Sequence, residues 1–428
     1  MIELAEKIAE YVVDVDYKDL SQTVIDEAKR RVIDTLGVAK ASLQSPPALV
    51  NKKMVNYYPG DSYLIGGGRA SPDFSSFYNG LLIRYLDFND TYLSKEPLHP
   101  SDMIGALLSV GTLFNKTGKD LILSVAVGYE VGVRLCNSSS LRKKGYDHVN
   151  FLEVATASAL SKMLSLSREQ VVNAISITLV PHIAMRETRS GELSMWKAGA
   201  AANADRNATF ATLSALNGFT GPSKPFSGKM GFINQIANDM DLTEFEKMDK
   251  PSGILKTYIK EFPVEYHAEA AIEAALKINV KNIKKVVIET YEAAKTILAD
   301  PEKWNPKNRE TADHSLPYVV AVSLLYHDFW LDSYQHINNP SVLNLMKNIT
   351  VTENRQYNEV YAEQLPTKII VKLDNGEVIE EEVKIPKGHS NMPMNNEEVE
   401  NKYVKLGGSK NELNAVWTLE ERMVRDIV

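Results

Sequence analysis

The spacing of apolar residues predicts a helical first half of the chain. From the start to about residue 250, Ala, Leu, Ile and Val recur at the three-to-four-residue spacing of amphipathic helices. Ser167 and Gln170 form a capping-box pattern ahead of one such segment. Segment 196–216, WKAGAAANADRNATFATLSAL, predicts a long helix with a face of small alanines, which lets a neighbouring helix approach closely. We expect these segments to form one helical domain.

The pattern changes after a loop rich in Gly, Pro and Ser at residues 218–232. Segment 284–294, KKVVIETYEAA, has the β-branched residues of a strand, and segment 367–386 has two alternating runs around Asp374-Asn375-Gly376, which predict a β-hairpin. Helical patterns lie between them. We therefore predict a mainly α protein with a smaller, inserted α+β domain: a helical domain at 1–250, completed by 390–428, and an α+β domain at 251–389.

Composition narrows the class of protein. Hydrophobic residues make up 44% and charged residues 24%, which is ordinary for a folded globular chain, and the formal net charge of −7 disfavours a nucleic-acid partner. The single cysteine, Cys136, excludes an internal disulfide and a cluster held by several thiolates. The acidic first residues do not resemble a signal peptide, and no apolar run approaches a membrane span of ~18 residues. We expect a cytoplasmic protein with no membrane partner.

A polar stretch interrupts the helical half between two apolar segments. Residues 85–102, YLDFNDTYLSKEPLHPSD, place Asp87, Asp90, Thr91 and His99 in a connecting loop, where functional side chains are common. These groups would converge if the preceding helix ran one turn further. A structural interpretation stays open, in which the carboxylates cap helices and His99 packs at the surface.

A second candidate lies at Lys197, about one turn into the helix expected at 196–216. The N-terminal end of a helix already carries positive partial charge, so a lysine there costs stability unless an anion answers it. Together with Arg186 and Arg189, this segment is suited to holding carboxylates. A plain surface lysine is the alternative.

Two further polar clusters precede helices in the second half. Lys260 and His267 lie in KTYIKEFPVEYHAEAAIEAAL, and Arg309 and Tyr318 lie in NPKNRETADHSLPYVVAVSLL. Capping and packing are available explanations for each residue. The chain has no GxGxxG, Walker A, GxSxG or HExxH pattern, and no second His or Cys stands at metal-ligand spacing from His99. We predict neither a tightly held metal nor a cofactor, and the alternative is a metal site that carboxylates assemble from separated segments.

Several long segments, taken together in their order, resemble the MmgE/PrpD family, whose best-known members are 2-methylcitrate dehydratases. The segments are RYLDFNDTYLSKEPLHPSD, MWKAGAAANADRNATFA, the TGP at 220–222, PVEYHAEAAIEAAL and RETADHSLPYVVAV. The resemblance implies a helical domain holding both chain ends, a smaller α+β lid domain, a site in the cleft between them, and a homodimer. It also implies a small di- or tricarboxylate as the substrate.

The resemblance implies specific site positions as well. They fall on Asp87, Thr91, His99, Lys197, His267 and Tyr318, with His148 in GYDHVNF as a further position. Residue chemistry adds Arg84, Lys260 and Arg309 as cations that offset the charge of a trianionic substrate.

Dehydration of a 3-hydroxy acid needs one group that takes a proton and one that protonates the departing hydroxide. We expect His99 and Asp87 to act in proton transfer and His148 or Tyr318 to protonate the leaving group. We expect Arg84, Thr91, Lys197, Lys260, His267 and Arg309 to bind substrate. The predicted function is dehydration of 2-methylcitrate, and of citrate, without an iron–sulfur cluster. A decarboxylase or epimerase acting on a related polycarboxylate such as cis-aconitate, or a non-catalytic carboxylate-binding protein, is the alternative.

Overall fold

The chain divides into two compact units in the computed structural model, which describes residues 3–428. Among the described residues, the helical unit consists of 3–190, 195–258 and 395–428. The second unit consists of 191–194 and 259–394. The prediction of a mainly α protein with a smaller α+β part is confirmed. The units include 251–258 with the helices and 390–394 with the α+β part, which shifts the expected boundaries by a few residues.

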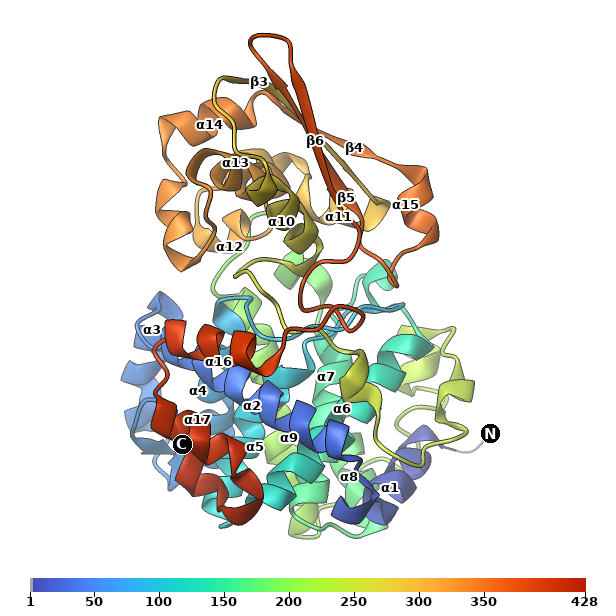
Figure 1. Cartoon of the computed structure of the whole chain (residues 1–428). Helices are drawn as coiled ribbons and strands as arrows, with labels where there is room; N and C mark the ends of the chain where they lie inside the picture. The colour runs from blue at the N-terminus through green and yellow to red at the C-terminus, as the bar shows by residue number, and fades with distance from the viewer. Residues whose placement is uncertain (1–2) are drawn as a thin grey trace. The chain divides into compact units, whose positions relative to one another are not determined.

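Long helices form the helical unit, in which α4 packs against α9, α9 against α7, and α7 against α6 (Figure 1). Its helices are α1 (Leu4–Asp14), α2 (Gln22–Ala41), α3 (Pro46–Met54), α4 (Pro72–Tyr85), α5 (Ile104–Leu113), α6 (Gly118–Ser138), α7 (Val149–Met163), α8 (Arg168–Leu179), α9 (Trp196–Leu216), α16 (Asn396–Lys405) and α17 (Lys410–Trp417). A two-stranded antiparallel sheet, β1 (Ser62–Tyr63) and β2 (Arg69–Ala70), lies ahead of α4.

Small residues set the distance between α4 and α9. A Cβ atom added at Gly80 would lie 3.3 Å from the Cα of Ala202 and 2.7 Å from Oδ2 of Asp205, so a larger residue would have to displace the Asp205 side chain. The helix predicted at 196–216 is present with those bounds, and its alanine face is buried as expected. The capping box of Ser167 and Gln170 is also present, at the start of α8.

Helix α6 is long and apolar enough, by length and composition, to cross a membrane. Its most apolar window is 83% buried inside the fold. Neighbouring helices such as α7 therefore cover its apolar surface, as expected for the core helix of a globular unit.

The second unit contains a four-stranded sheet in the order β4-β3-β5-β6. Its strands are β3 (Ile283–Thr290), β4 (Ile349–Glu353), β5 (Thr367–Leu373) and β6 (Val378–Val383). Strands β3 and β4 are parallel, and the other neighbours are antiparallel. The strand expected near 284–294 and the hairpin around Asp374-Asn375-Gly376 are confirmed, whereas β4 was not predicted from the sequence.

Helices cover one side of this sheet in Figure 1, with α10 packed against β5 and β6. The helices of the unit are α10 (Glu269–Lys277), α11 (Glu292–Leu298), α12 (Arg309–Ala312), α13 (Leu316–Tyr326), α14 (Pro340–Met346) and α15 (Arg355–Glu359). Along β5, Ile369 and Val371 alternate into the core, while β6 leaves its glutamates partly or fully exposed at the sheet edge. Such charges discourage further strands from pairing there.

Candidate functional site

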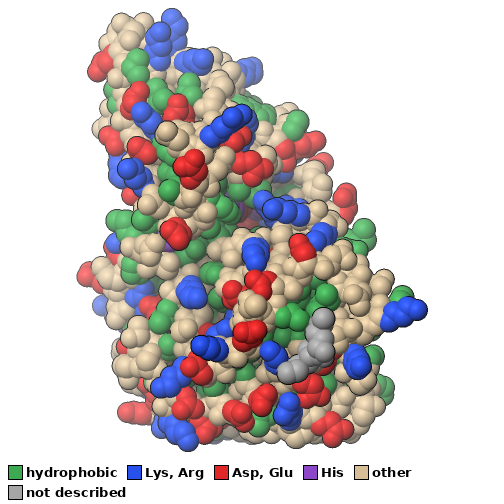
Figure 2. Space-filling view, turned by 90° about the vertical axis from the view of Figure 1, so that its right-hand side faces the viewer, with side chains coloured by type: hydrophobic (Ala, Val, Ile, Leu, Met, Phe, Trp, Pro, Cys, Tyr) green, Lys and Arg blue, Asp and Glu red, His purple; other side chains and the backbone are tan. Residues whose placement is uncertain are grey.

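Most charged side chains lie on the surface, where both signs are interspersed on the face shown in Figure 2. Several charged groups of the helical unit are buried instead, and one cluster of them holds predicted site residues. Arg84, Asp87 and Lys197 are each at most 2% exposed. Burying ionised groups is expensive unless they are paired, so such a cluster needs a specific arrangement or a function.

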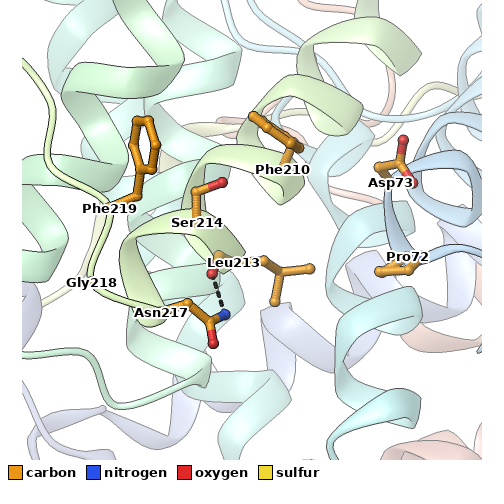
Figure 3. A pocket seen from close by; sticks show the side chains of 8 residues that line it. All are labelled: Pro72, Asp73, Phe210, Leu213, Ser214, Asn217, Gly218 and Phe219. Atoms are coloured by element: carbon orange, nitrogen blue, oxygen red, sulfur yellow. Dashed lines mark hydrogen bonds between the residues drawn. The ribbon is translucent and has the colours of Figure 1, made fainter.

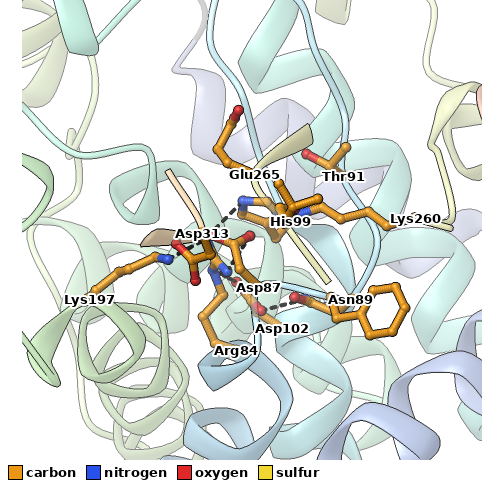
Figure 4. Close-up of polar contacts among 12 residues, drawn as sticks. Arg84, Asp87, Asn89, Thr91, His99, Asp102, Lys197, Lys260, Glu265 and Asp313 are labelled. Carbon is orange, nitrogen blue, oxygen red and sulfur yellow. Dashed lines mark hydrogen bonds and ion pairs between the residues drawn. The ribbon is translucent and has the colours of Figure 1, made fainter. Parts of the chain in front are cut away.

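Asp87 is the centre of this cluster, as Figure 4 shows. Helix α4 ends at Tyr85, and Asp87 follows in the left-handed conformation, with φ 51°, which few residues other than glycine adopt. Nη1 of Arg84 lies 2.8 Å from Oδ1 of Asp87, and Nζ of Lys197 lies 2.9 Å from Oδ2. Lys197 is the second residue of α9, so Asp87 supplies the anion that a lysine at a helix start requires.

His99 is held at both ring nitrogens. Nδ1 lies 2.8 Å from the carbonyl oxygen of Asp90, and Nε2 lies 3.0 Å from Nη2 of Arg84. A carbonyl only accepts and a guanidinium only donates, so Nδ1 carries the proton and Nε2 presents its lone pair. His99 is therefore fixed as a neutral imidazole in one tautomer.

Asp90 and Thr91 make hydrogen bonds that organise the loop. The carboxylate of Asp90 accepts from the hydroxyl of Tyr129 at 2.7 Å and from the amide of Ser101 at 2.9 Å. The hydroxyl of Thr91 donates to the carbonyl of Leu98 at 3.2 Å. Helix α4 ends at Tyr85, so the further helical turn that would bring Asp87 and Asp90 together is not formed.

His148 lies close to His99, with the ring centroids 5.6 Å apart and the rings edge to face. Its Nδ1 is 3.2 Å from Oδ1 of Asp147, and Nε of Arg189 is 3.0 Å from Oδ2 of the same carboxylate. Burial, together with the positive charge of Arg189, lowers the pKa of His148 to about 3. His148 is therefore neutral near pH 7, like His99.

Sequence reasoning missed two buried acids of this cluster. Asp147 would have been detectable as the neighbour of His148 in GYDHVNF. Although burial alone would raise the pKa of Asp147, the positive charge of Arg189 lowers it. Burial raises the pKa of Asp102 to about 7, and its Oδ1 accepts from Nδ2 of Asn89 at 2.8 Å. Nothing in the sequence distinguishes Asp102 from a helix cap.

The second unit holds the other predicted residues. Nζ of Lys260 donates to the carbonyl of Val264 at 3.1 Å. Nδ1 of His267 is 2.8 Å from Oε1 of Glu265, and Nε2 is 3.2 Å from the hydroxyl of Tyr361. Burial alone would raise the pKa of Glu265, but His267 and the cations nearby lower it to about 2.

Arg309 and Tyr318 meet around Tyr334 in the same unit. The guanidinium of Arg309 lies 4.6 Å from the centre of the Tyr334 ring, and Tyr318 stacks on that ring at 6.2 Å. The hydroxyl of Tyr318 donates to the carbonyl of Ser333 at 2.7 Å, and burial raises its pKa. This geometry favours packing as the role of Tyr318.

A separate hollow of about 550 Å³ lies beside α9 and the start of α4 (Figure 3). Phe210, Leu213 and Phe219 line it, and Asn217 donates to the carbonyl of Leu213 at 2.8 Å. Among its lining residues there is one carboxylate, Asp73, and no basic side chain. This hollow does not suit an anionic ligand.

Comparisons with known proteins agree with the resemblance. The MmgE/PrpD N-terminal domain matches residues 6–244, and the MmgE/PrpD C-terminal domain matches residues 262–416. A protein of Saccharomyces cerevisiae named probable 2-methylcitrate dehydratase is 29% identical, over 89% of this chain and 81% of its own. The 2-methylcitrate dehydratase of Cupriavidus necator is 28% identical, over 89% and 85%, and the alkylcitrate dehydratase phiI of a fungal species is 26% identical, over 92% and 86%. The chain belongs to the MmgE/PrpD family.

Proposed function

We propose that this protein is a hydro-lyase that dehydrates a citrate-type tricarboxylate, with 2-methylcitrate as its substrate. The names of the similar dehydratases support the reaction class. The observation that carries the proposal is the pair of neutral imidazoles, His99 and His148, beside buried cations. One neutral imidazole can take a proton and the other, once protonated, can give one.

Removal of water begins with the C–H bond next to a carboxylate. In our proposal Nε2 of His99 takes this proton when substrate replaces Arg84 as its partner, and the C–H electrons form the new C=C bond. The carbonyl of Asp90 then stabilises the imidazolium through Nδ1–H. Asp87 acts through Arg84, which contacts both Asp87 and His99, rather than by touching the imidazole.

The C–O bond breaks on the neighbouring carbon, and the departing hydroxide needs a proton. We assign this proton to His148. The ligand-free imidazole is neutral, but a bound trianion favours its charged form and so raises its pKa. Tyr318 is the weaker candidate, since its proton is engaged by the carbonyl of Ser333.

Cations offset the negative charge that grows as the proton is removed. Lys197 and Arg84 supply this charge in the helical unit, and Thr91 is a further binding group in the loop. Lys260, His267 and Arg309 are the proposed contributors from the second unit. The single cysteine, Cys136, cannot supply the several thiolates of an iron–sulfur cluster, so His148 provides the acid assistance in our proposal.

Steady-state turnover of 2-methylcitrate, followed at 240 nm as the unsaturated product forms, tests the assignment. We expect His99→Ala to lower kcat by about 100- to 10,000-fold, the range for loss of a general base. His182→Ala is the matched control, because His182 lies in the same unit and its Nδ1 binds the carbonyl of Thr178. Near-normal turnover by His99→Ala would remove His99 from the chemistry.

A decarboxylase or epimerase would use the same anchors, because both reactions pass through a carbanion. Product identification after incubation with 2-methylcitrate, citrate, cis-aconitate and tartrate separates these reactions. We further propose a cytoplasmic homodimer, which light scattering and fractionation would test. The relative from Yarrowia lipolytica is named mitochondrial, so fractionation has a clear alternative outcome.

A further inference from the structure

Arg189 lies just before α9 and uses only part of its guanidinium. Its Nε is 3.1 Å from Oδ1 and 3.0 Å from Oδ2 of Asp147. The terminal nitrogens Nη1 and Nη2 are buried and have no hydrogen-bond partner among the described residues. Donors on a charged group are costly to leave unanswered, so this end of Arg189 is suited to receive an acceptor.

His148, which contacts the same Asp147, has a buried acceptor without a hydrogen-bond partner in residues 3–428. Its Nε2 is buried and, within the described chain, also lacks a hydrogen-bond partner. Because Nδ1 faces the Asp147 carboxylate, which only accepts, Nδ1 carries the proton and Nε2 offers a lone pair. Asp147 therefore positions two side chains that each have buried atoms without a hydrogen-bond partner among the residues described. Arg189 offers a pair of donors, and His148 offers one acceptor.

A ligand that satisfies both must bring a planar acceptor and a neighbouring donor. We propose that Arg189 binds the substrate carboxylate adjacent to the departing hydroxyl, while that hydroxyl donates to Nε2 of neutral His148. When Nε2 then takes up a proton from water, the bond reverses, and Nε2–H donates to the oxygen that leaves. The ligand grouping is thus an α-hydroxycarboxylate. This inference rests on the proposed function, and it adds a substrate-binding residue that places the leaving group on its acid.

Two features of the site favour a carboxylate over a single-atom anion. The free edge of Arg189 is the face of the guanidinium that forms parallel, bidentate bonds to a planar carboxylate. Asp147 already compensates the charge of Arg189 through Nε, so the pair is fixed in orientation before a ligand arrives. Lys197, in contrast, is engaged with Asp87 and presents a point charge.

Binding measured by calorimetry tests this without requiring turnover. The probes are citrate and propane-1,2,3-tricarboxylate, which keeps three carboxylates but lacks the hydroxyl. We expect Arg189→Gln to weaken both ligands by about 10- to 150-fold, the range for hydrogen bonds to a charged group. We expect His148→Phe to weaken citrate and leave the hydroxyl-free ligand within about threefold. Arg206→Gln is the control, since Arg206 is 44% exposed and pairs at 3.5 Å with Asp73.

Affinity for both ligands within threefold of wild type in Arg189→Gln would overturn the inference. If that variant does not fold by circular dichroism, a crystal structure of the wild-type complex with propane-1,2,3-tricarboxylate decides. A carboxylate on Nη1 and Nη2 of Arg189 supports the inference, and carboxylates bound elsewhere refute it. The binding inference and the proposed dehydration can fail independently. Citrate bound at Arg189 with no product absorbance at 240 nm would refute the dehydration and support Arg189 as a binding residue.

Discussion

Replacing Asp102 by Asn isolates the energetic effect of one buried acid. Oδ1 of Asp102 accepts from Asn89, and Nε of Arg84 is 3.9 Å from Oδ2. Oδ2 has no hydrogen-bond partner in the described part of the chain, so an amide placed there gives up no bond. Asn keeps the shape and the acceptor for Asn89 but has no proton to lose.

The structure gives the sign and size of the effect. Burial raises the pKa of Asp102 from 3.8 to about 7. The folded protein thus keeps a proton that the unfolded chain loses above pH 3.8. The contribution of this proton to the free energy of unfolding is fully present below pH 3.8 and is lost as the pH rises to 7. Three pKa units at 1.36 kcal/mol each make this loss about 4 kcal/mol.

Urea unfolding at pH 4 to 8, followed by circular dichroism, measures this contribution. We expect the free energy of unfolding of Asp102→Asn, relative to wild type, to rise by about 4 kcal/mol between pH 4 and pH 7 and then to level off. Asp374→Asn, in an exposed turn, is the control, and its difference should stay within about 0.5 kcal/mol. A difference for Asp102→Asn that is flat with pH would refute the reasoning, because it would mean that Arg84 keeps the acid ionised.

Two other substitutions test how the site is supported. Nζ of Lys402 is 2.6 Å from Asp34 and donates to the carbonyl of Phe88 at 2.9 Å, so Lys402→Met should lower stability by about 3–5 kcal/mol by stranding a buried acid. The double variant Lys402→Met/Asp34→Leu removes the stranded acid, so it should recover stability in thermal melts. Its kcat should stay low because the bond to the Phe88 carbonyl is still missing, and full recovery of kcat as well would show that this contact is unimportant. A Cβ at Gly118 would lie 1.8 Å from the carbonyl oxygen of Leu419, so Gly118→Ala should cost about 1–3 kcal/mol in urea unfolding, and an unchanged midpoint would contradict the packing.

Local patterns in the sequence were sufficient for much of the fold. Period and capping predicted α9 and α8, and Asn375-Gly376 predicted the β5–β6 hairpin, because these signals act over a few residues. Strand β4 escaped prediction. It is short, mixes Thr with Ile, and gains its partner β3 from more than fifty residues away. Long-range pairing of this kind leaves no local signal.

The candidate site likewise combines features that the local sequence predicts with features that depend on distant residues. A lysine at a helix start predicted an anion, and Asp87 provides it. The neutral state of His148 depends on burial and on Arg189, which lies some forty residues away, so composition and spacing do not predict it. We expected Asp87 to contact His99, but Arg84 lies between them and contacts both side chains. The turn after α4 sets the directions of these side chains, and residue types alone do not predict those directions.

The insertion of the second unit between Tyr258 and Asn395 has a consequence for biosynthesis. On the ribosome, every residue of the α+β unit is made before α16, which carries Lys402 and its bond to the loop carbonyl of Phe88. At 5–20 residues per second, segment 395–428 takes roughly 2–7 seconds to synthesise. The nascent helical unit therefore stays incomplete until the inserted unit has been synthesised, and only then does the loop bearing Asp87 gain its contact with Lys402.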